Sequence, residues 1–182
     1  MIQILQDRFS MYNNFELIND DVLKVDLKSL IKENKKDKIK AVKIVANLPY
    51  YITTPIIIKL LEERLEIESI TVMVQKEVAD RLVARPGEKN SWAITYSIIY
   101  FADAEKVLEV PSTSFMPAPE VNSSVIKLNI LKEPSVKVKN EEMLFKVIKL
   151  AFAQKRKTLL NALTNGKLAS KEEVEKMLTA LN

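Results

Sequence analysis

The chain has 182 residues, 47% of them hydrophobic and 29% charged, and a formal net charge of +4. This length and composition suit one domain with a packed core plus a small appendage. The sequence shows no signal-peptide pattern and no apolar stretch near the roughly 18 residues of a membrane span. We therefore expect a cytoplasmic protein with no membrane partner. Because cysteine and histidine are both absent, disulfides, thiolate chemistry, histidine bases and the usual zinc ligand sets are excluded, and we expect no metal site.

The amino-terminal part of the chain alternates between helix and strand patterns. Apolar residues at positions 1, 2, 5 and 9 predict an amphipathic helix over residues 1–9. Residues 15–19 and 41–46 each read as a strand. Thr54 followed by Pro55 is typical of a helix start, with the threonine as the cap and the proline at the first helical position.

The rest of the chain continues this alternation and then becomes helical. Residues 69–74 are almost entirely apolar, as expected for a central parallel strand. The further expected elements are helices over 75–84 and 91–102, an antiparallel edge pair of strands over 106–110 and 125–130, and helices over 141–164 and 170–181. Glu133-Pro134 predicts a boundary between a sheet domain over residues 1–131 and a small all-α domain over residues 132–182.

The tetrapeptide Asn47-Leu48-Pro49-Tyr50 follows the expected strand 41–46, at the carboxyl edge where open α/β sheets bind ligands. The Asn47 side-chain oxygen and a backbone carbonyl at Leu48 or Pro49 can each accept one N–H of an exocyclic adenine amine, which directs the nitrogen lone pair at a methyl donor. Tyr50 offers a ring on which an extruded base can stack, a contact worth about 1–3 kcal/mol. The pattern favours methyl transfer to adenine N6, although an ordinary polar strand end before a helix start explains the same residues.

Positive charge is concentrated in the carboxyl-terminal part. Residues 1–131 hold 17 Lys and Arg against 18 Asp and Glu, whereas residues 132–182 hold 11 against 6. At 3.6 residues per turn, one helix over 141–164 would gather four basic side chains within an arc of about 100°. They are Lys146, Lys149, Arg156 and Lys157. Such a helix is expected to dock by its apolar side and to offer its basic side to RNA phosphates, the alternative being a solvated lysine face.

Five motifs occur in the order known from one family. Besides NLPY at 47–50, they are NDDVLK at 19–24, VQKEVADRL at 74–82, SFMPAPEVNSSV at 114–125 and AFAQKRKTL at 151–159. From residue 1 to about residue 165, the chain resembles the ribosomal RNA adenine N6,N6-dimethyltransferases of the KsgA type, also called dimethyladenosine transferases. The resemblance implies an α/β fold, namely part of a class I (Rossmann-like) methyltransferase sheet followed by a small helical RNA-binding domain. It also implies dimethylation of N6 in loop adenosines of small-subunit ribosomal RNA during ribosome biogenesis, with S-adenosylmethionine as the methyl donor.

The resemblance gives roles to two further side chains. Asp21 stands where the family has an acid that accepts a hydrogen bond from the adenine amine of S-adenosylmethionine, so Asp21 and Asn47 are candidate cofactor-binding residues. Phe115 stands where an aromatic ring helps to sandwich the target base opposite Tyr50. Without the resemblance, Asp21 reads as a surface-turn residue and Phe115 as a loop anchor. The implied partner is small-subunit ribosomal RNA or the assembling small subunit, and the oligomeric state is left open.

Two departures from the family pattern accompany the resemblance. The family holds S-adenosylmethionine with a glycine-rich loop, but the only glycines here are Gly87 and Gly166, and neither lies in such a loop. We therefore expect an amino-terminally truncated chain whose sheet lacks its first strands. Ser91-Trp92 replaces an aromatic-glycine pair, which puts the local backbone geometry in doubt.

Three other functions share parts of the pattern. Enzymes that dimethylate large-subunit ribosomal RNA and confer macrolide resistance share much of the Asn-x-Pro-Tyr apparatus, but the segment 115–125 and the helix 152–159 favour the small-subunit enzyme. DNA adenine methyltransferases usually have a second proline where Leu48 stands. A third possibility is a binding module that recognises ribosomal RNA or an assembling subunit without catalysis, which the missing glycine loop supports for this chain by itself.

Overall fold

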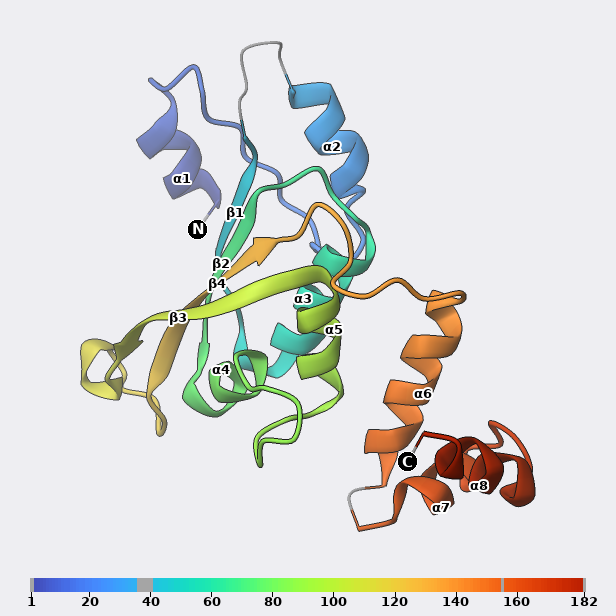
Figure 1. The fold of residues 1–182 in the computed structure, drawn as a ribbon. Coiled ribbons are helices and arrows are strands. Elements are labelled where there is room, and N and C mark those ends of the chain that lie inside the picture. Colours follow the sequence, from blue (N-terminus) through green and yellow to red (C-terminus); the bar gives the residue numbers. More distant parts are fainter. Residues whose placement is uncertain (1, 36–40, 155, 182) are drawn as a thin grey trace.

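A computed structural model describes residues 2–35, 41–154 and 156–181. At its centre is a four-stranded sheet with the order β1-β2-β4-β3 (Figure 1). The strands are β1 (Lys43–Asn47), β2 (Ser69–Gln75), β3 (Ala102–Val110) and β4 (Ser123–Ile130). β1 and β2 are parallel, and β4 runs antiparallel to both β2 and β3. The expected antiparallel edge pair is thus confirmed, with β3 at the edge of the sheet.

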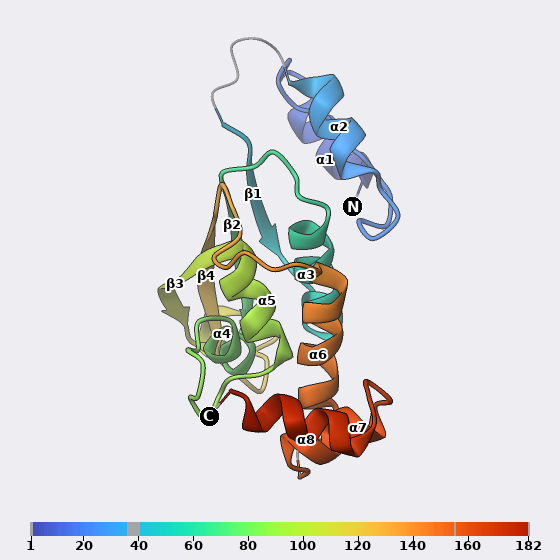
Figure 2. The same cartoon turned by 45° about the vertical axis from the view of Figure 1, so that its right-hand side comes forward.

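One face of the sheet carries the hydrophobic core. Ile70, Val72 and Val74 of β2 are fully buried, as are Ile126 and Leu128 of β4. Because side chains alternate along a strand, these residues share one face, which is covered by helices (Figures 1 and 2). The covering helices are α3 (Thr53–Glu62), α4 (Lys76–Leu82) and α5 (Ala93–Phe101), and α6 (Glu141–Ala153) packs against α5.

The segment 15–19 is not a strand, contrary to the sequence prediction. It follows α1 (Ile2–Phe9), which is confirmed, and the Phe15 ring stacks on Phe9 with centroids 4.6 Å apart. A strand is held by backbone hydrogen bonds to a neighbouring strand. β1 is the last strand on its side of the sheet, and residues 15–19 do not pair with it. The chain continues into α2 (Leu27–Asn34), whose cap Asp26 accepts a hydrogen bond from the Ser29 amide at 3.0 Å.

The expected single helix over 141–164 is also wrong. α6 ends at Ala153, and α7 (Leu159–Asn165) begins after a turn in which the Lys157 amide donates to the Gln154 carbonyl at 3.0 Å. Thr158 is the reason for the restart, since it has an extended backbone and its hydroxyl accepts from the Asn161 amide, as an N-cap does. Ser170 caps α8 (Lys171–Thr179) in the same way, which confirms the last expected helix.

The start of α6 is fixed to the sheet domain by a polar and aromatic cluster. The Glu141 carboxylate accepts hydrogen bonds from the Arg64 guanidinium and, at 2.7 Å, from the Tyr100 hydroxyl. The Phe145 ring stacks on Phe101 with centroids 5.6 Å apart and meets Tyr100 edge-on at 5.3 Å. The division of the chain between residues 131 and 132 stays a prediction.

This cluster predicts a pH dependence of stability. The hydrogen bonds from Tyr100 and Arg64 hold the pKa of Glu141 below its usual value of 4.5. A lowered pKa in the folded state stabilises the protein above the unfolded value, and this contribution is lost as the pH falls through the folded value. We therefore expect thermal unfolding, followed by circular dichroism, to show a steeper loss of stability below pH 4.5 in the wild type than in the Glu141→Gln variant. The effect will be small because the Arg64 and Glu141 side chains are 50% and 42% exposed; equal slopes would contradict the assignment.

None of the described helices combines the length and the apolar character needed to cross a membrane.

Candidate active site

Four chain segments meet where β1, β2 and β3 end and β4 begins, which we call the carboxyl edge of the sheet. Asn47 ends β1 and pairs with Met73 of β2, while Gln75 at the end of β2 pairs with Ser123, the first residue of β4. Ser123 pairs in turn with Val110, the last residue of β3. The carboxyl ends of three strands therefore lie together, which is where open α/β sheets bind their ligands.

The tetrapeptide after β1 is held in a defined turn. Asn47 is exposed, Leu48 is buried, and Pro49 has an extended backbone with φ −60° and ψ 131°. The Pro49 carbonyl accepts two hydrogen bonds, each 3.1 Å long, from the Ile52 amide and the Thr53 hydroxyl. These bonds make α3 begin at Thr53, so the expected cap at Thr54 is wrong.

This turn separates the two carbonyls that the sequence left as alternatives. The Pro49 carbonyl is already occupied by donors from its own chain. No described residue donates a hydrogen bond to the Leu48 carbonyl. Within the tetrapeptide, the Asn47 side-chain oxygen and the Leu48 carbonyl are therefore acceptors to which no described residue donates.

Tyr50 is anchored by a residue that sequence reasoning left without a role. Its hydroxyl lies 2.6 Å from the hydroxyl of Ser123, a residue that is fully buried. The bond joins the turn after β1 to the start of β4 and restricts the position of the Tyr50 ring. Ser123 stands inside the motif 114–125, but its partner lies 73 positions away, and nothing local indicates the pair.

Phe115 follows a short 3₁₀ helix (Ser112–Ser114) at the same edge of the sheet. Its side chain is half-buried. The loop is tied to the edge through Asn122, whose side chain accepts from the Ser112 amide and whose carbonyl accepts from the Lys76 amide, both at 2.9 Å. The structure thus brings the Phe115 loop to the same edge as Tyr50.

Asp21 lies in the exposed turn before α2, and its hydrogen bonds are local. Its carboxylate accepts from the Leu23 amide at 3.0 Å, and its carbonyl accepts from the amides of Lys24 and Val25. No described hydrogen bond joins it to the Asn47 segment. Its cofactor role stays a prediction.

The four predicted basic residues do not share one helix face. Lys146 and Lys149 are exposed on α6, whereas Arg156 and Lys157 are exposed in the turn that follows it. The arc expected from a continuous helix is therefore wrong, because the chain stops being helical after Ala153. In both views α7 and α8 lie at the opposite end of the molecule from α1 and α2 (Figures 1 and 2).

Two lysines near the carboxyl ends of the strands, Lys76 and Lys106, already pair with acidic side chains. Glu109 accepts hydrogen bonds from Lys76 at 3.0 Å and Lys106 at 3.3 Å, and these bonds, the one from Lys76 first, lower the pKa of Glu109. Lys106 also donates to Asp80 at 2.8 Å, which is the main reason that its pKa is raised. Lys76 and Lys106 thus each form an ion pair with an acidic side chain of the same surface.

The departure at Ser91-Trp92 requires no unusual backbone. Trp92 has φ −139° and ψ 174°, an extended conformation open to any residue. Its ring lies under the Arg81 guanidinium, 4.9 Å from the ring centroid, and Arg81 also pairs with Glu77 at 3.8 Å. The loss of the family's glycine therefore imposes no strain on the turn before α5.

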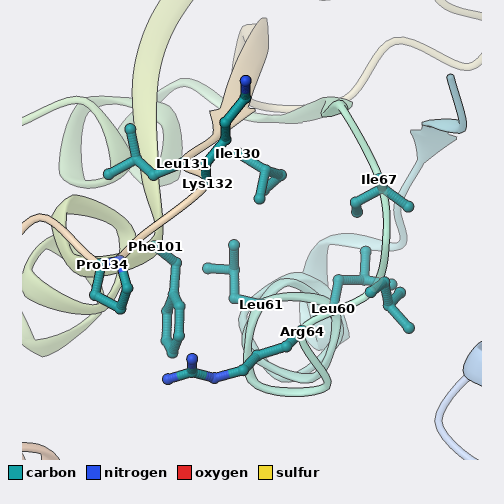
Figure 3. Close-up of a pocket in the computed structure, with 10 residues that line it drawn as sticks. Leu60, Leu61, Arg64, Ile67, Phe101, Ile130, Leu131, Lys132 and Pro134 are labelled. Carbon is teal, nitrogen blue, oxygen red and sulfur yellow. The ribbon is translucent and has the colours of Figure 1, made fainter.

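A small cavity of about 160 Å³ lies at the opposite edge of the sheet (Figure 3). Leucine, isoleucine and proline side chains form most of its wall, together with Phe101. Its Arg64 guanidinium extends past the Phe101 ring, 5.6 Å from the centroid, and pairs with Glu141. This cavity is remote from the tetrapeptide and its main cation has a partner, so it is not the candidate active site.

Solved structures define the class of protein to which this fold belongs. The crystal structure of a dimethyladenosine transferase from Plasmodium falciparum matches 90% of this chain and 55% of its own, with a TM-score of 0.70 and 30% identity. The 23S rRNA methyltransferase ErmE matches 90% of this chain and 62% of its own, with a TM-score of 0.63. At 23% identity, that second likeness shows the fold alone. The expected class I methyltransferase fold is confirmed.

Sequence comparison specifies the family. A family model described as ribosomal RNA adenine dimethylase matches residues 1–182. Ribosomal RNA small subunit methyltransferase A of Alkaliphilus oremlandii is 47% identical over 183 aligned residues, which cover all of this chain and 63% of that protein. The chain belongs to the ribosomal RNA adenine dimethylase family. It spans less than two thirds of the length of the curated relatives it matches.

The residues present do not fit the methionine end of S-adenosylmethionine, the methyl donor of this type of family. Gly87 lies in a turn between α4 and α5 with φ +84°, and Gly166 follows α7. Asn47 and Asp21, the residues expected at the adenosine end, are both exposed. No described hydrogen bond joins them, and their cofactor role stays a prediction.

Proposed function

We propose that this chain is the substrate-orienting part of an enzyme that dimethylates N6 of loop adenosines in small-subunit ribosomal RNA, in the cytoplasm. The observation that carries the proposal is the turn after β1, which leaves Asn47 and the Leu48 carbonyl available as neighbouring acceptors beside the anchored Tyr50. Membership of the ribosomal RNA adenine dimethylase family supports it. So does the 47% identity to a protein named for small-subunit ribosomal RNA, against 23% to one named for 23S rRNA.

Orientation of the amine is the chemical task of these residues. The lone pair of adenine N6 is delocalised into the ring, so the neutral amine attacks only when it is turned toward an electrophilic methyl group. Asn47 Oδ1 and the Leu48 carbonyl each accept one N–H, which fixes the rotation of the amine; after the first transfer one N–H remains for the same purpose. S-adenosylmethionine, when bound, supplies the methyl group. Asp21 and Asn47 are the proposed contacts to its adenosine end.

The target base must leave the RNA stack to reach this edge. A loop adenosine costs less to extrude than a paired one, by a few kcal/mol. Tyr50 and Phe115 are the proposed aromatic contacts to the extruded base. The fixed hydroxyl of Tyr50 supports this role, since a ring held in place loses little freedom when a base stacks on it.

Two parallel calorimetric titrations test the proposal, one with S-adenosylmethionine and one with a hairpin from small-subunit ribosomal RNA. Binding of both ligands supports the enzyme function for the chain itself. Binding of the hairpin alone supports a chain that recognises substrate without methyl transfer, the candidate favoured by the absence of a glycine-rich loop among the 182 residues. Failure to bind the hairpin, or preference for a large-subunit hairpin, would contradict the proposal.

The basic residues predict a specific salt dependence. Lys146 and Lys149 are exposed on α6, and we propose that they contact phosphates together with Arg156 and Lys157. Each phosphate contact with single-stranded RNA contributes about 0.7 to the slope of log K against log salt concentration. Replacing Lys146 and Lys149 with Gln is therefore expected to reduce the slope by about 1.4, measured by fluorescence anisotropy between low and moderate salt. The matched control is Lys171→Gln at the start of α8, which is expected to change the slope little.

A further inference from the structure

Two large side chains at the candidate active site are almost fully exposed. Tyr51 is 88% exposed and directly follows Tyr50, and Met116 is 100% exposed and directly follows Phe115. In each pair the first residue is partly buried. The same edge of the sheet therefore presents an inner pair of aromatic rings and an outer pair of large apolar side chains.

The backbone that carries the outer pair is fixed. Tyr51 lies within the 3₁₀ turn (Tyr50–Ile52) that the Ile52 amide closes onto the Pro49 carbonyl. Met116 follows a loop closed by the bonds of Ser114 to Pro111 and of Phe115 to Ser112. The Tyr50–Ser123 hydrogen bond ties the first segment to the start of β4, and the bond from the Ser112 amide to Asn122 ties the second to the residue before it. The outer side chains are thus exposed on a fixed frame, so little backbone freedom is lost if they bind a ligand.

The charges around Tyr51 and Met116 favour contact with RNA bases over contact with phosphates. No lysine or arginine occurs between Lys106 and Lys127, whereas Glu109 and Glu120 do. Lys106 and Lys127, which bound this stretch, and Lys76 each pair with an acid. A surface without free positive charge offers little to RNA phosphates. Bases, which carry no net charge and have flat apolar faces, suit it better.

We propose that Tyr51 and Met116 contact the unstacked bases on either side of the target adenosine, an inference that rests on the proposed function. Extruding one base leaves the faces of its two neighbours without stacking partners. A tyrosine ring replaces a lost stacking partner, and an unbranched methionine adapts to an irregular gap between bases. Residues 51 and 116 therefore set which nucleotides are accepted beside the target, separately from the orientation of its amine.

The test measures the affinity of the whole chain for a fluorescent small-subunit ribosomal RNA hairpin and for a matched hairpin with abasic nucleotides on both sides of the loop adenosine. On the intact hairpin, Tyr51→Ala is expected to raise Kd about 5- to 100-fold and Met116→Ala several-fold. On the abasic hairpin, wild type and both variants are expected to bind equally. The slope of log K against log salt concentration should be the same for all three proteins, because no phosphate contact is lost.

Two controls make the result decisive. Tyr51→Phe keeps the ring and should bind like the wild type, and Met11→Ala removes a side chain that is 91% exposed but far along the chain from the tetrapeptide. Both exposed sites tolerate replacement without loss of packing, which circular dichroism verifies. Unchanged affinity of Tyr51→Ala and Met116→Ala, or an equal loss on the abasic hairpin, overturns this inference alone. Failure of the wild type to bind either hairpin overturns both this inference and the proposed function.

Discussion

Replacing Asn47 with Ala is expected to lower the rate of methyl transfer about 100-fold or more, because the amine loses one of the two acceptors that fix its rotation. The Leu48 carbonyl remains, but one acceptor leaves the amine free to turn about the other. RNA affinity should change little, since base stacking and phosphate contacts are untouched. The loss will therefore appear in kcat rather than in the KM for RNA.

The rate is best measured in a chimera with a complete methyl-donor site, in which residues 1–182 replace the 183 matching residues of the Alkaliphilus oremlandii relative. Incorporation of labelled methyl groups into small-subunit ribosomal RNA is the readout. Asn47→Asp is the matched control, because a carboxylate also accepts an N–H and should retain more activity than alanine. An alanine variant as active as the wild type would show that Asn47 does not orient the amine.

The sequence pattern was clearest where a strand has a buried face. β2 is apolar over nearly its whole length, with one face against the helices and a strand on either side. β3 was predicted over residues 106–110 although most of it is exposed. Residues 15–19 also include apolar side chains, but they pair with no described strand, and Phe15 packs on Phe9. Whether a segment joins a sheet depends on contacts with distant parts of the chain, and its local pattern carries no such information.

In the helical part, the apolar periodicity failed to predict where one helix ends and the next begins. Apolar spacing continues smoothly from α6 into α7, yet the chain turns between them. Thr158 caps α7 directly after the turn. Gly166, at the other end of α7, has no side chain, which lets that end approach α6. A Cβ at Gly166 would lie 2.4 Å from Leu150 Cδ2. The Thr158 signal was local and readable, whereas the need for Gly166 arises only from packing.

The residues of the candidate active site also fall into those with a local sequence signal and those that only the packing reveals. Asn47 and Tyr50 were identified from the sequence because strand, turn and helix follow one another within a few residues. The choice between the carbonyls of Leu48 and Pro49 depended on which threonine begins α3, and the proline after Thr54 pointed to the wrong one. Packing selects Thr53, which is 2% exposed and bonds to Pro49. Ser123 became visible only through a contact across the sheet.

The Tyr50 ring, held by its hydrogen bond to Ser123, is expected to decide how well the target base is extruded. Tyr50→Ala removes the ring on which the extruded base is proposed to stack, a loss of about 1–3 kcal/mol, or roughly 5- to 150-fold in the population of extruded base. A hairpin with 2-aminopurine at the target position reports extrusion as increased fluorescence and requires no methyl donor. We expect the increase seen with wild type to be largely lost with Tyr50→Ala.

Conservative changes separate the ring from its anchor. Tyr50→Phe keeps the ring but leaves the buried Ser123 hydroxyl without its partner, and Ser123→Ala leaves the Tyr50 hydroxyl without its own. Each should destabilise the fold by about 1–3 kcal/mol, whereas the double variant should cost less than the sum, because no polar group is then left unpaired. If the double variant extrudes the base as well as wild type, the ring alone is sufficient. If it regains stability but not extrusion, the hydrogen bond holds the ring at the angle that stacking requires, and Ser123 is a positioning residue for the substrate base.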